Sequence, residues 1–503
     1  MDMKPSCSIL ALILLVSFMS TGRADDVTIA DVALAEDWEF VSRLIEQGTE
    51  NLDAVQADGM TALHWAVWHD KTEIAAQLVD ADASPAAENR YKVTPLSIAC
   101  TNGNADIVRL LLAAGADANS VLPSGETALM TASRSGSVEA VQALLEHKSA
   151  VNAKERKGQT AIMWAAAEGH ARVVALLLRA GAEYQTPLKS GFTPLFFAVR
   201  EGHWPVVDVL LAANVDINGT MQPENSGGRA PRRGMSGLML AIENGHFELA
   251  VRLLEAGADP NDQRSGFTPL HAMTWVRKPN RGDGLDGTPP PIGSGRVTSL
   301  QCVRQLVEHG ADVNARLKRG RSGRGHLTQI GATPFLFAAD TADLPLMKLL
   351  LELDADPTVP NRDDCPPLLA AAGIGTRAPG EEAGTEDEAI AAVKLLLELN
   401  ADINAVDRNG ESTMHGAAYA SWPKMVRFLA DQGANISVWN RKNRYGWTPL
   451  LIAEGHRPGN FKPAAKTIEA VRDVMRKAGV VPPPPTPRKG NNEQYSKKRK
   501  PAQ

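Results

Sequence analysis

The stretch that decides the fold is T-P-L-S-I-A-C-T-N-G-N-A-D-I-V-R-L-L-L-A-A-G-A-D-A-N at residues 94–119. Thr94 suits a helix N-cap and Pro95 suits the first helical position, where a missing N–H costs nothing, so a short helix is predicted. A glycine interrupts it, and the apolar run from Ile107 predicts a second helix. Gly115 suits the left-handed residue that ends a helix. The stretch therefore predicts a helix–turn–helix unit.

The same phrase recurs along the chain at a regular spacing. Its first position returns every 33 residues from Thr61 to Thr193, and longer steps continue it to Thr448. The full set is Thr61, Thr94, Thr127, Thr160, Thr193, Ser236, Thr268, Thr333, Pro366, Ser412 and Thr448. A repeat of this length predicts an all-α solenoid of about eleven units, each of which buries its apolar face on its neighbours.

The residues that should end the second helices test this frame. A helix-ending residue commonly has a left-handed conformation, which Gly tolerates best and Asn or Asp next. The frame places such residues at Asp82, Gly115, Lys148, Gly181, Asn214, Gly257, Gly310, Asp354, Asn400 and Gly433. Only Lys148 departs from the preferred residue types, so we expect the frame to hold along the whole array.

Four stretches carry a resemblance to a known family. They read T-A-L-H-W-A at 61–66, T-P-L-S-I-A at 94–99, T-P-L-H-A-M at 268–273 and G-H-F-E-L-A-V-R-L-L-E-A-G-A-D at 245–259. With the 33-residue period, they make residues 29–478 resemble the ankyrin-repeat family. The resemblance implies helix–turn–helix units joined by β-hairpin loops. It also implies a non-enzymatic scaffold that binds one or more partner proteins through its concave face and hairpin tips.

The sequence divides into four segments. They are a signal peptide at 1–24, an N-terminal capping half-repeat at 25–58, the repeat array at 59–478 and a Pro-rich basic tail at 479–503 that is expected to be disordered. Insertions interrupt the array near 219–234, 278–298, 316–330 and 374–388. The last insertion is acidic, and we expect it to be disordered as well. Pro366 replaces a capping threonine, so the unit at 366–404 should be the least stable.

The N-terminal segment predicts export. Lys4 precedes an apolar run at 9–18, and small residues suit cleavage after Ala24. The alternative is an uncleaved N-terminal anchor. The D-G-M-T-A-L-H-W-A stretch at 58–66 resembles exported bacterial ankyrin-repeat proteins, which implies a periplasmic or extracellular location. No later apolar run reaches the length of a membrane helix, and we expect a monomer.

The resemblance also indicates which residues contact a partner. In the family, contacts concentrate at the residue before the threonine and at the two residues before the glycine between the helices. Large side chains there are typical interface anchors, and in this chain they are Met60, Trp68, His69, Phe192, Phe267, Trp275 and Trp447. The alternative is that several of them pack on the neighbouring hairpin.

Two of the insertions carry basic side chains. These are Arg229, Arg232 and Arg233 in the first, and Arg316, Lys318, Arg319, Arg321 and Arg324 in the second. If both insertions project along the same edge, they form a basic lip that docks an acidic partner or a polyanion. The alternative is two solvated loops that bind nothing.

The sequence predicts no catalytic residues, cofactor or metal site. A G-x-G-x-x-G match at 282–287 precedes three prolines, which exclude the helix that a dinucleotide site needs. His64, His271 and His415 share the fourth position of the repeated phrase, where we expect each ring to pack and hydrogen-bond near the hairpin. The net charge of −5 argues against binding to nucleic acid.

Two other classes of function remain open. One is a surface-adhesion or structural protein that acts through the basic loops and tail. The other is an enzyme with its active site in the insertions at 278–330, although those segments show no spacing of a nucleophile and a base.

Overall fold

The computed structural model describes residues 27–48, 51–225, 232–278, 291–322, 326–380, 383–457 and 462–486. In these ranges the regular elements are helices, which confirms the predicted all-α class. The expected β-hairpin loops are reduced, in the same ranges, to two isolated antiparallel bridges, Val121 with Thr127 and Thr220 with Ser236. The loops are too short for a ladder, because paired strands need several residues each.

Several of the sequence predictions fall outside the described residues. They concern the signal segment at 1–24, the glycine-rich match at 282–287, Arg229, Arg324 and the tail from 487 onward. Among the helices that are described, none is both long enough and apolar enough to cross a bilayer.

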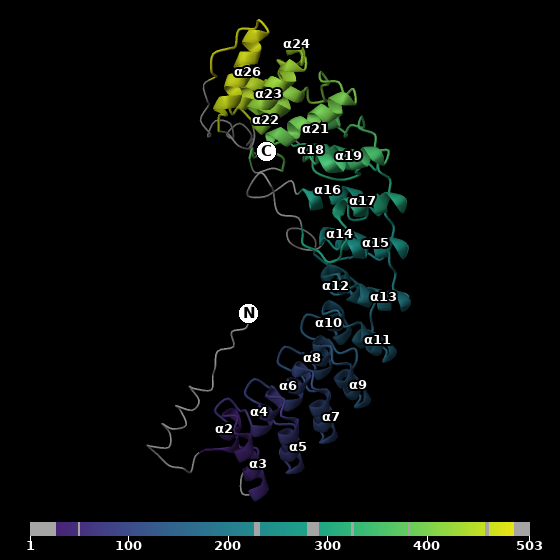
Figure 1. Cartoon of the computed structure of the whole chain (residues 1–503), viewed down its shortest axis with the longest axis vertical. Helices are drawn as coiled ribbons and strands as arrows, with labels where there is room; N and C mark the ends of the chain where they lie inside the picture. Colours follow the sequence, from purple (N-terminus) through teal and green to yellow (C-terminus); the bar gives the residue numbers. More distant parts are fainter. Residues whose placement is uncertain are drawn as a thin grey trace, which may run out of the picture. The chain divides into compact units, whose positions relative to one another are not determined.

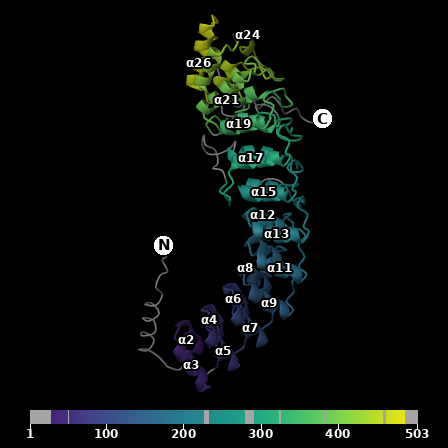
Figure 2. The ribbon, with the colours of Figure 1, turned by 45° about the vertical axis from the view of Figure 1, so that its right-hand side comes forward.

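The chain forms two compact bodies, and the first consists of Met1–Asp216 with Pro223–Asn225. Its helices are α2 (Ile29–Leu34), α3 (Trp38–Gln47), α4 (Ala62–Trp68), α5 (Thr72–Asp80), α6 (Pro95–Asn102), α7 (Ala105–Ala113), α8 (Ala128–Ser135), α9 (Val138–Glu146), α10 (Ala161–Ala167), α11 (Ala171–Arg179), α12 (Pro194–Glu201) and α13 (Trp204–Ala212). The even-numbered helices pack side by side in one layer and the odd-numbered helices in another (Figures 1 and 2). We call these the first-helix layer and the second-helix layer.

The second body consists of Ile217–Gln222 with Ser226–Gln503. Its first-helix layer contains α14 (Gly237–Glu243), α16 (Pro269–Arg277), α18 (Pro334–Asp340), α20 (Pro367–Ala371), α22 (Thr413–Ala420) and α25 (Pro449–Ala453). Its second-helix layer contains α15 (Phe247–Glu255), α17 (Ser299–Glu308), α19 (Leu344–Glu352), α21 (Glu386–Glu398), α23 (Pro423–Asp431) and α26 (Ala465–Lys477). The short helix α24 (Ile436–Trp439) lies in the loop before the last unit.

The helices α2 and α3 form a complete pair where the sequence indicated a half-repeat. Thr28 caps α2 reciprocally with Asp31, because the Asp31 N–H donates to Thr28 Oγ1 at 3.3 Å and the Thr28 N–H donates to Asp31 Oδ2 at 3.0 Å. Gly48 ends α3 in the left-handed conformation. The first unit therefore begins at Thr28.

The predicted helix ends are confirmed at all ten positions. Each residue has a positive φ, from 62° at Lys148 and Asn400 to 94° at Gly115 and Gly257. Lys148 adopts the left-handed conformation although its residue type disfavours it. The backbone geometry of the repeat is thus kept even where the side chain carries a conformational cost.

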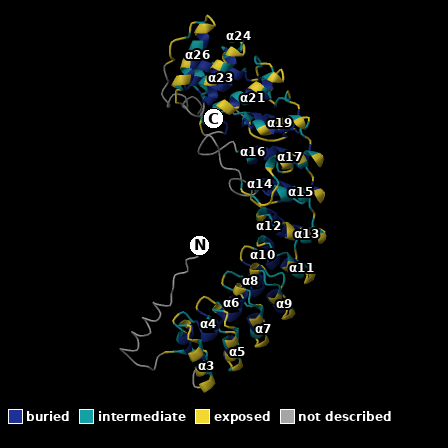
Figure 3. Cartoon of the chain, viewed as in Figure 1, coloured by how far each residue is buried: buried dark blue, intermediate teal, exposed yellow. Residues whose placement is uncertain are grey.

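The apolar residues of the two layers are largely buried, and Figure 3 colours the ribbon by that burial. In α7, Ile107, Val108 and Leu111 are buried, whereas Asp106 and Arg109 are exposed. This spacing of three and four residues places one apolar stripe toward the neighbouring helices. Because each unit covers only its neighbours, the stability of each body is built from nearest-neighbour contacts.

The acidic insertion at 374–388 is ordered where it is described, so the expectation of disorder is wrong there. Thr385 caps α21, because the Glu388 N–H donates to Thr385 Oγ1 at 3.2 Å and the Thr385 N–H donates back to Glu388 Oε2 at 2.7 Å. Three acidic residues form the first helical turn. Carboxylates are favourable at a helix N-terminus because the backbone N–H groups there are positive. Lys278 Nζ also lies 2.9 Å from Glu388 Oε1.

Candidate partner-binding surface

The predicted partner contacts lie on the first-helix layer and the loop tips beside it, which together we call the first-helix face. Trp68, at the C-terminal end of α4, has 57% of its surface accessible. The next residue, His69, is half-buried and lies against the rings of Trp38 and Trp65 at centroid distances of 5.7 and 6.2 Å. Trp68 therefore projects into solvent, whereas His69 joins α3 to α4.

Met60 and Phe192 are buried, so the expectation that they are exposed anchors is wrong. Their accessible fractions are 6% and 8%. The Met60 sulfur accepts a hydrogen bond from Asn89 Nδ2 at 3.4 Å, which links it to the next loop. The Phe192 ring lies 5.0 Å from that of Phe197, and the Arg200 guanidinium lies 5.2 Å from its centroid. Both side chains pack within the body.

In the second body, Phe267 and Trp275 are half-buried and form an edge-to-face pair at 4.9 Å. The Arg232 guanidinium lies 5.6 and 5.7 Å from the two ring centroids, and its Nη2 is 2.6 Å from Glu243 Oε1. Burial raises the pKa of Glu243, and the neighbouring Arg232 offsets part of that rise. Three predicted contact residues are thus packed in one cluster whose charges neutralise each other.

The other basic residues of the predicted lip differ in their availability. Arg316 donates from Nε to the Gly331 carbonyl at 3.0 Å and from Nη2 to the Pro360 carbonyl at 2.8 Å, so it fixes the insertion to the array. Arg316 is nevertheless exposed, as are Arg233, Lys318, Arg319 and Arg321. Because Arg232 and Arg316 are engaged by other parts of the chain, the lip is smaller than expected, and its binding role stays a prediction.

Parts of the insertions at 316–330 and 374–388 cover the first-helix face of the second body. Leu327 packs against one apolar cluster that contains Leu336 of α18 and another that contains Tyr419 of α22. Arg457 Nη1 donates to the Thr376 carbonyl at 2.8 Å and holds the other insertion beside this face. The chain itself therefore occupies part of this surface.

Trp447, another predicted contact, belongs to the same covered region. Its half-buried side chain packs against the cluster of Tyr419 and lies 5.4 Å from the ring of Tyr445. In the first body, by contrast, the units from α4 to α13 follow one another without insertions. An insertion reaches that body's face at Glu224, whose N–H donates to the Lys189 carbonyl at 2.9 Å.

The histidines in the fourth position of the repeated phrase pack and hydrogen-bond as predicted. Each Nε2–H donates to a carbonyl of the following loop, and Nδ1 lies within hydrogen-bond distance of the capping hydroxyl. The carbonyl pairs are His64 with Val93 at 3.0 Å, His271 with Ala332 at 3.1 Å and His415 with Arg441 at 3.2 Å. Burial lowers the pKa of all three, to about 4 for His271 and His415.

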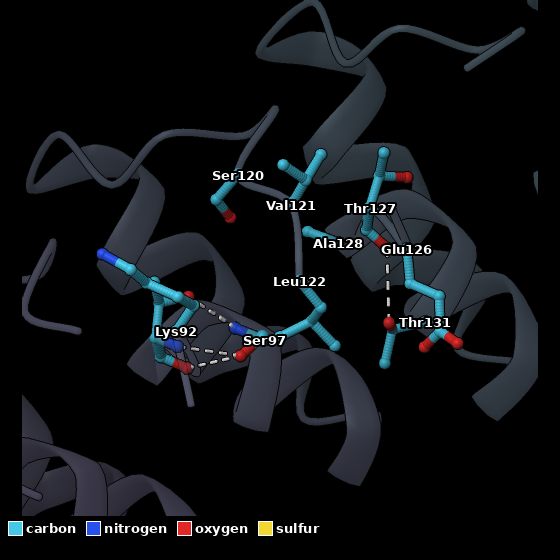
Figure 4. Close-up of a pocket in the computed structure, with 10 residues that line it drawn as sticks. Lys92, Ser97, Ser120, Val121, Leu122, Glu126, Thr127, Ala128 and Thr131 are labelled. Carbon is cyan, nitrogen blue, oxygen red and sulfur yellow. Dashed lines mark hydrogen bonds between the residues drawn. The ribbon is translucent and has the colours of Figure 1, made fainter. Parts of the chain in front are cut away.

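One unit has a small residue at this position, and a hollow opens there. Ser97 Oγ donates back to the Thr94 carbonyl at 2.7 Å, so it does not reach the following loop. Figure 4 shows the residues around this shallow hollow, with Lys92, Leu122 and Glu126 among those that line it. It is too shallow to enclose a water molecule, so we interpret it as missing side-chain volume and not as a ligand site.

Family models match both bodies. A model described as "Ankyrin repeats (3 copies)" matches residues 85–155, 148–221 and 383–462, one described as "Ankyrin repeats (many copies)" matches 238–273, and one described as "Ankyrin repeat" matches 58–90 and 265–318. The chain is an ankyrin-repeat protein. Its helix pairs are ankyrin units, and such repeats imply protein partners.

Two curated relatives resemble a short part of the ankyrin array. Protein phosphatase 1 regulatory subunit 27 of Mus musculus is 34% identical over 102 residues, which are 20% of this chain and 66% of the relative. The Homo sapiens protein of the same name is 33% identical over the same shares. Among solved structures, the human ASB11 ankyrin repeat domain is 24% identical with a TM-score of 0.40, and the alignment covers 53% of this chain and all of that one.

Sequence reasoning missed the residues at the outer end of the ankyrin loop tips. Tyr91 has 62% of its surface accessible, and Arg156 and Lys157 are exposed. Tyr91 and Lys157 directly precede the left-handed residue of their tip, and Arg156 lies two residues before it. Met60 and Phe192 instead directly follow the left-handed residue, and both are buried. The signal that would have found them is this offset from the left-handed residue of the tip, which is Lys92 beside Tyr91 and Gly158 beside Lys157.

The buried ionisable groups of the ankyrin array are held by other parts of the chain. Glu411 accepts hydrogen bonds from Tyr419 Oη at 2.7 Å and Asn443 Nδ2 at 2.8 Å. Burial, reinforced by nearby Asp407, raises the pKa of Glu411 to about 7. Burial also raises the pKa of the Cys302 thiol to about 12, so this thiol is not a nucleophile at neutral pH. Within the described ranges, no three His, Cys, Asp or Glu side chains converge as metal ligands would.

Proposed function

We propose that the chain is a non-enzymatic scaffold that binds a partner protein through the first-helix face of its first body. The observation that carries the proposal is Trp68, a large side chain left 57% accessible at a position where the family contacts its partners. Leaving this ring in water adds nothing to folding, while burying it in an interface contributes about 1.5–3 kcal/mol. The cover over the second body's face also favours the first body as the docking surface.

The test is a paired measurement of binding and stability. Trp68→Ala should weaken binding of a captured partner by about 2 kcal/mol or more and leave the melting temperature nearly unchanged. Leu111→Ala should cost ~2–5 kcal/mol of stability, because Leu111 is fully buried. Trp275→Ala should also destabilise, because it removes the packing against Phe267 and Arg232. A Trp68→Ala protein that melts early and binds normally would remove the main support for this face.

We propose further that residues 1–24 direct export, so that the scaffold acts in the periplasm or outside the cell. We also propose that it acts as a monomer. The motive is the order of Lys4, the apolar run at 9–18 and the small residues before Asp25. Mass spectrometry of the exported protein should find an N-terminus near Asp25. Recovery of the chain from the cytosol with Met1 intact would contradict export.

A further inference from the structure

The loop tips of the first body carry an excess of cations that its second-helix layer lacks. The tips at 56–60, 89–93, 122–126, 155–159 and 188–192 contain five Lys or Arg and three Asp or Glu, a net charge of +2. The helices α5, α7, α9, α11 and α13 contain three Lys or Arg and six Asp or Glu, a net charge of −3. The first body is therefore polarised, with its positive side on the first-helix face.

The tips at 155–159 and 188–192 are the neighbouring pair with the highest combined net charge, and their cations face solvent. Glu155 is buried, with 9% accessible, and its carboxylate accepts the Gln159 N–H at 2.9 Å. Arg156 and Lys157 beside it are exposed, and no ion pair among the described residues involves either of them. The Arg156 N–H donates to the Ser124 carbonyl at 3.2 Å, which fixes the tip to the preceding loop. The acid of this tip is thus used internally while its bases face solvent.

An aromatic residue beside these tips has an unsatisfied donor. The Arg134 guanidinium of α8 lies 4.9 Å from the ring centroid of Trp164 on α10. The Trp164 Nε1–H is buried and has no acceptor in the described part of the chain. Trp65, at the corresponding position of an earlier unit, donates its Nε1–H to Gln56 Oε1 at 2.8 Å. Glu155 occupies the position of Gln56 in the later unit, but its carboxylate accepts the Gln159 N–H and no hydrogen bond joins it to Trp164.

The exposed cations of these tips have no acid paired with them among the residues that the structure describes, and a carboxylate is the group that satisfies such cations. We propose that the surface formed by Arg134, Arg156, Lys157, Trp164 and Lys189 binds an extended acidic segment of the partner protein. This inference rests on the proposed function and names the chemistry of the partner. Complementary charge steers the encounter and fixes its register, and its effect weakens as salt screens it.

The experiment uses the full chain and a fluorescein-labelled peptide of Asp, Glu and Leu, with a peptide in which Lys replaces the acids as the control probe. The tip variant is Arg156→Glu with Lys157→Glu and Lys189→Glu. The matched control is Arg109→Glu with Arg172→Glu and Arg179→Glu in the second-helix layer, which changes the net charge equally. Fluorescence anisotropy should show that the tip variant loses about tenfold or more in affinity and that the control stays within about twofold.

Two further readouts separate a site from general attraction. The wild-type affinity should fall about fivefold or more between ~50 mM and ~300 mM salt. Trp164→Phe, which keeps a ring beside Arg134 and removes only an N–H that is shielded from solvent, should stay within about twofold at either salt concentration. Equal losses in the tip variant and the control, or equal binding of the basic peptide, would overturn the inference. Tighter binding of single-stranded DNA than of the acidic peptide would also overturn it, in favour of a polyanion site.

The outcome can be told apart from failure of the proposed function. A captured partner that is lost with Trp68→Ala but kept by the tip variant would leave the scaffold proposal standing and remove the acidic segment. A partner kept by both variants would remove both proposals.

Discussion

Lys148 ends α9 in a left-handed conformation, and replacing it by glycine should stabilise the first body. Its φ is 62°, while the corresponding residues of the neighbouring units, Gly115 and Gly181, have φ of 94° and 87°. A residue with a Cβ atom pays about 1–2 kcal/mol for this conformation. Glycine removes that cost but loses about 0.4–1 kcal/mol through the greater freedom of the unfolded chain. The expected net gain for Lys148→Gly is about 0.5–1 kcal/mol.

The contacts around Lys148 leave little else to change. Its carbonyl accepts a hydrogen bond from Asn119 Nδ2 at 3.4 Å, and this bond survives because the backbone makes it. The reverse variant, Gly181→Lys, is the matched control. A Cβ atom added at Gly181 meets nothing within 4 Å, and the Gly181 carbonyl accepts from Asn152 Nδ2 at 3.1 Å in the same way. Gly181→Lys should therefore lose about as much as Lys148→Gly gains.

The assay is thermal unfolding of the full chain, followed by circular dichroism, together with hydrogen exchange over 138–146. For a body of this size, 1 kcal/mol corresponds to a shift of about 2–4 °C. Lys148→Gly should raise the transition by about 1–4 °C and slow exchange in α9, and Gly181→Lys should lower the transition. If both variants shift the transition in the same direction, backbone strain at Lys148 is not the cause.

Three further predictions concern stability. Because burial raises the pKa of Glu411 to about 7, the folded state holds a proton there that the unfolded state releases near 4.5, so stability should fall as pH rises between these values. Glu411→Gln should flatten this dependence of stability on pH and stabilise the chain at pH 8 by about 1–3 kcal/mol. A wild-type chain whose stability rises between pH 4.5 and pH 7 would contradict the reasoning. Ser97→His should fill the hollow in Figure 4 and gain about 1 kcal/mol in chemical denaturation, whereas a loss of stability would mean that the loop cannot take a ring. Hydrogen exchange should be faster in 366–404 than in 94–182, because Pro366 makes no side-chain cap bond and α20 has five residues; uniform protection would count against this.

The helix pairs and their ends follow from local chemistry, and that is why the sequence predicts them. A capping hydroxyl such as Thr94, a proline after it and a left-handed glycine at the end act within a few residues of themselves. The 33-residue period then repeats the unit. Even the histidine contacts were predictable, because His64 reaches a loop whose position the repeat sets.

The degree of exposure at the loop tips was decided by tertiary contacts. Met60 and Trp68 both occupy positions that contact partners in the family, yet one is buried and the other is exposed. The difference comes from Asn89, which lies in the next loop and donates a hydrogen bond to the Met60 sulfur. The sequence around Met60 contains no pattern that predicts this contact. The same holds for Arg232, whose charge is neutralised by Glu243 on α14.

The insertions show the same division between local and tertiary control. Their composition indicates loops, and composition alone led to the expectation of disorder for 374–388. In the folded protein the acidic end of that segment forms the first turn of α21, because Thr385 caps the helix and Lys278 pairs with Glu388. Lys278 is more than a hundred residues away along the chain, so only the packed array could bring the two charges together. The sequence by itself determined where helices begin and end, and the tertiary structure decided which side chains remain free to meet a partner.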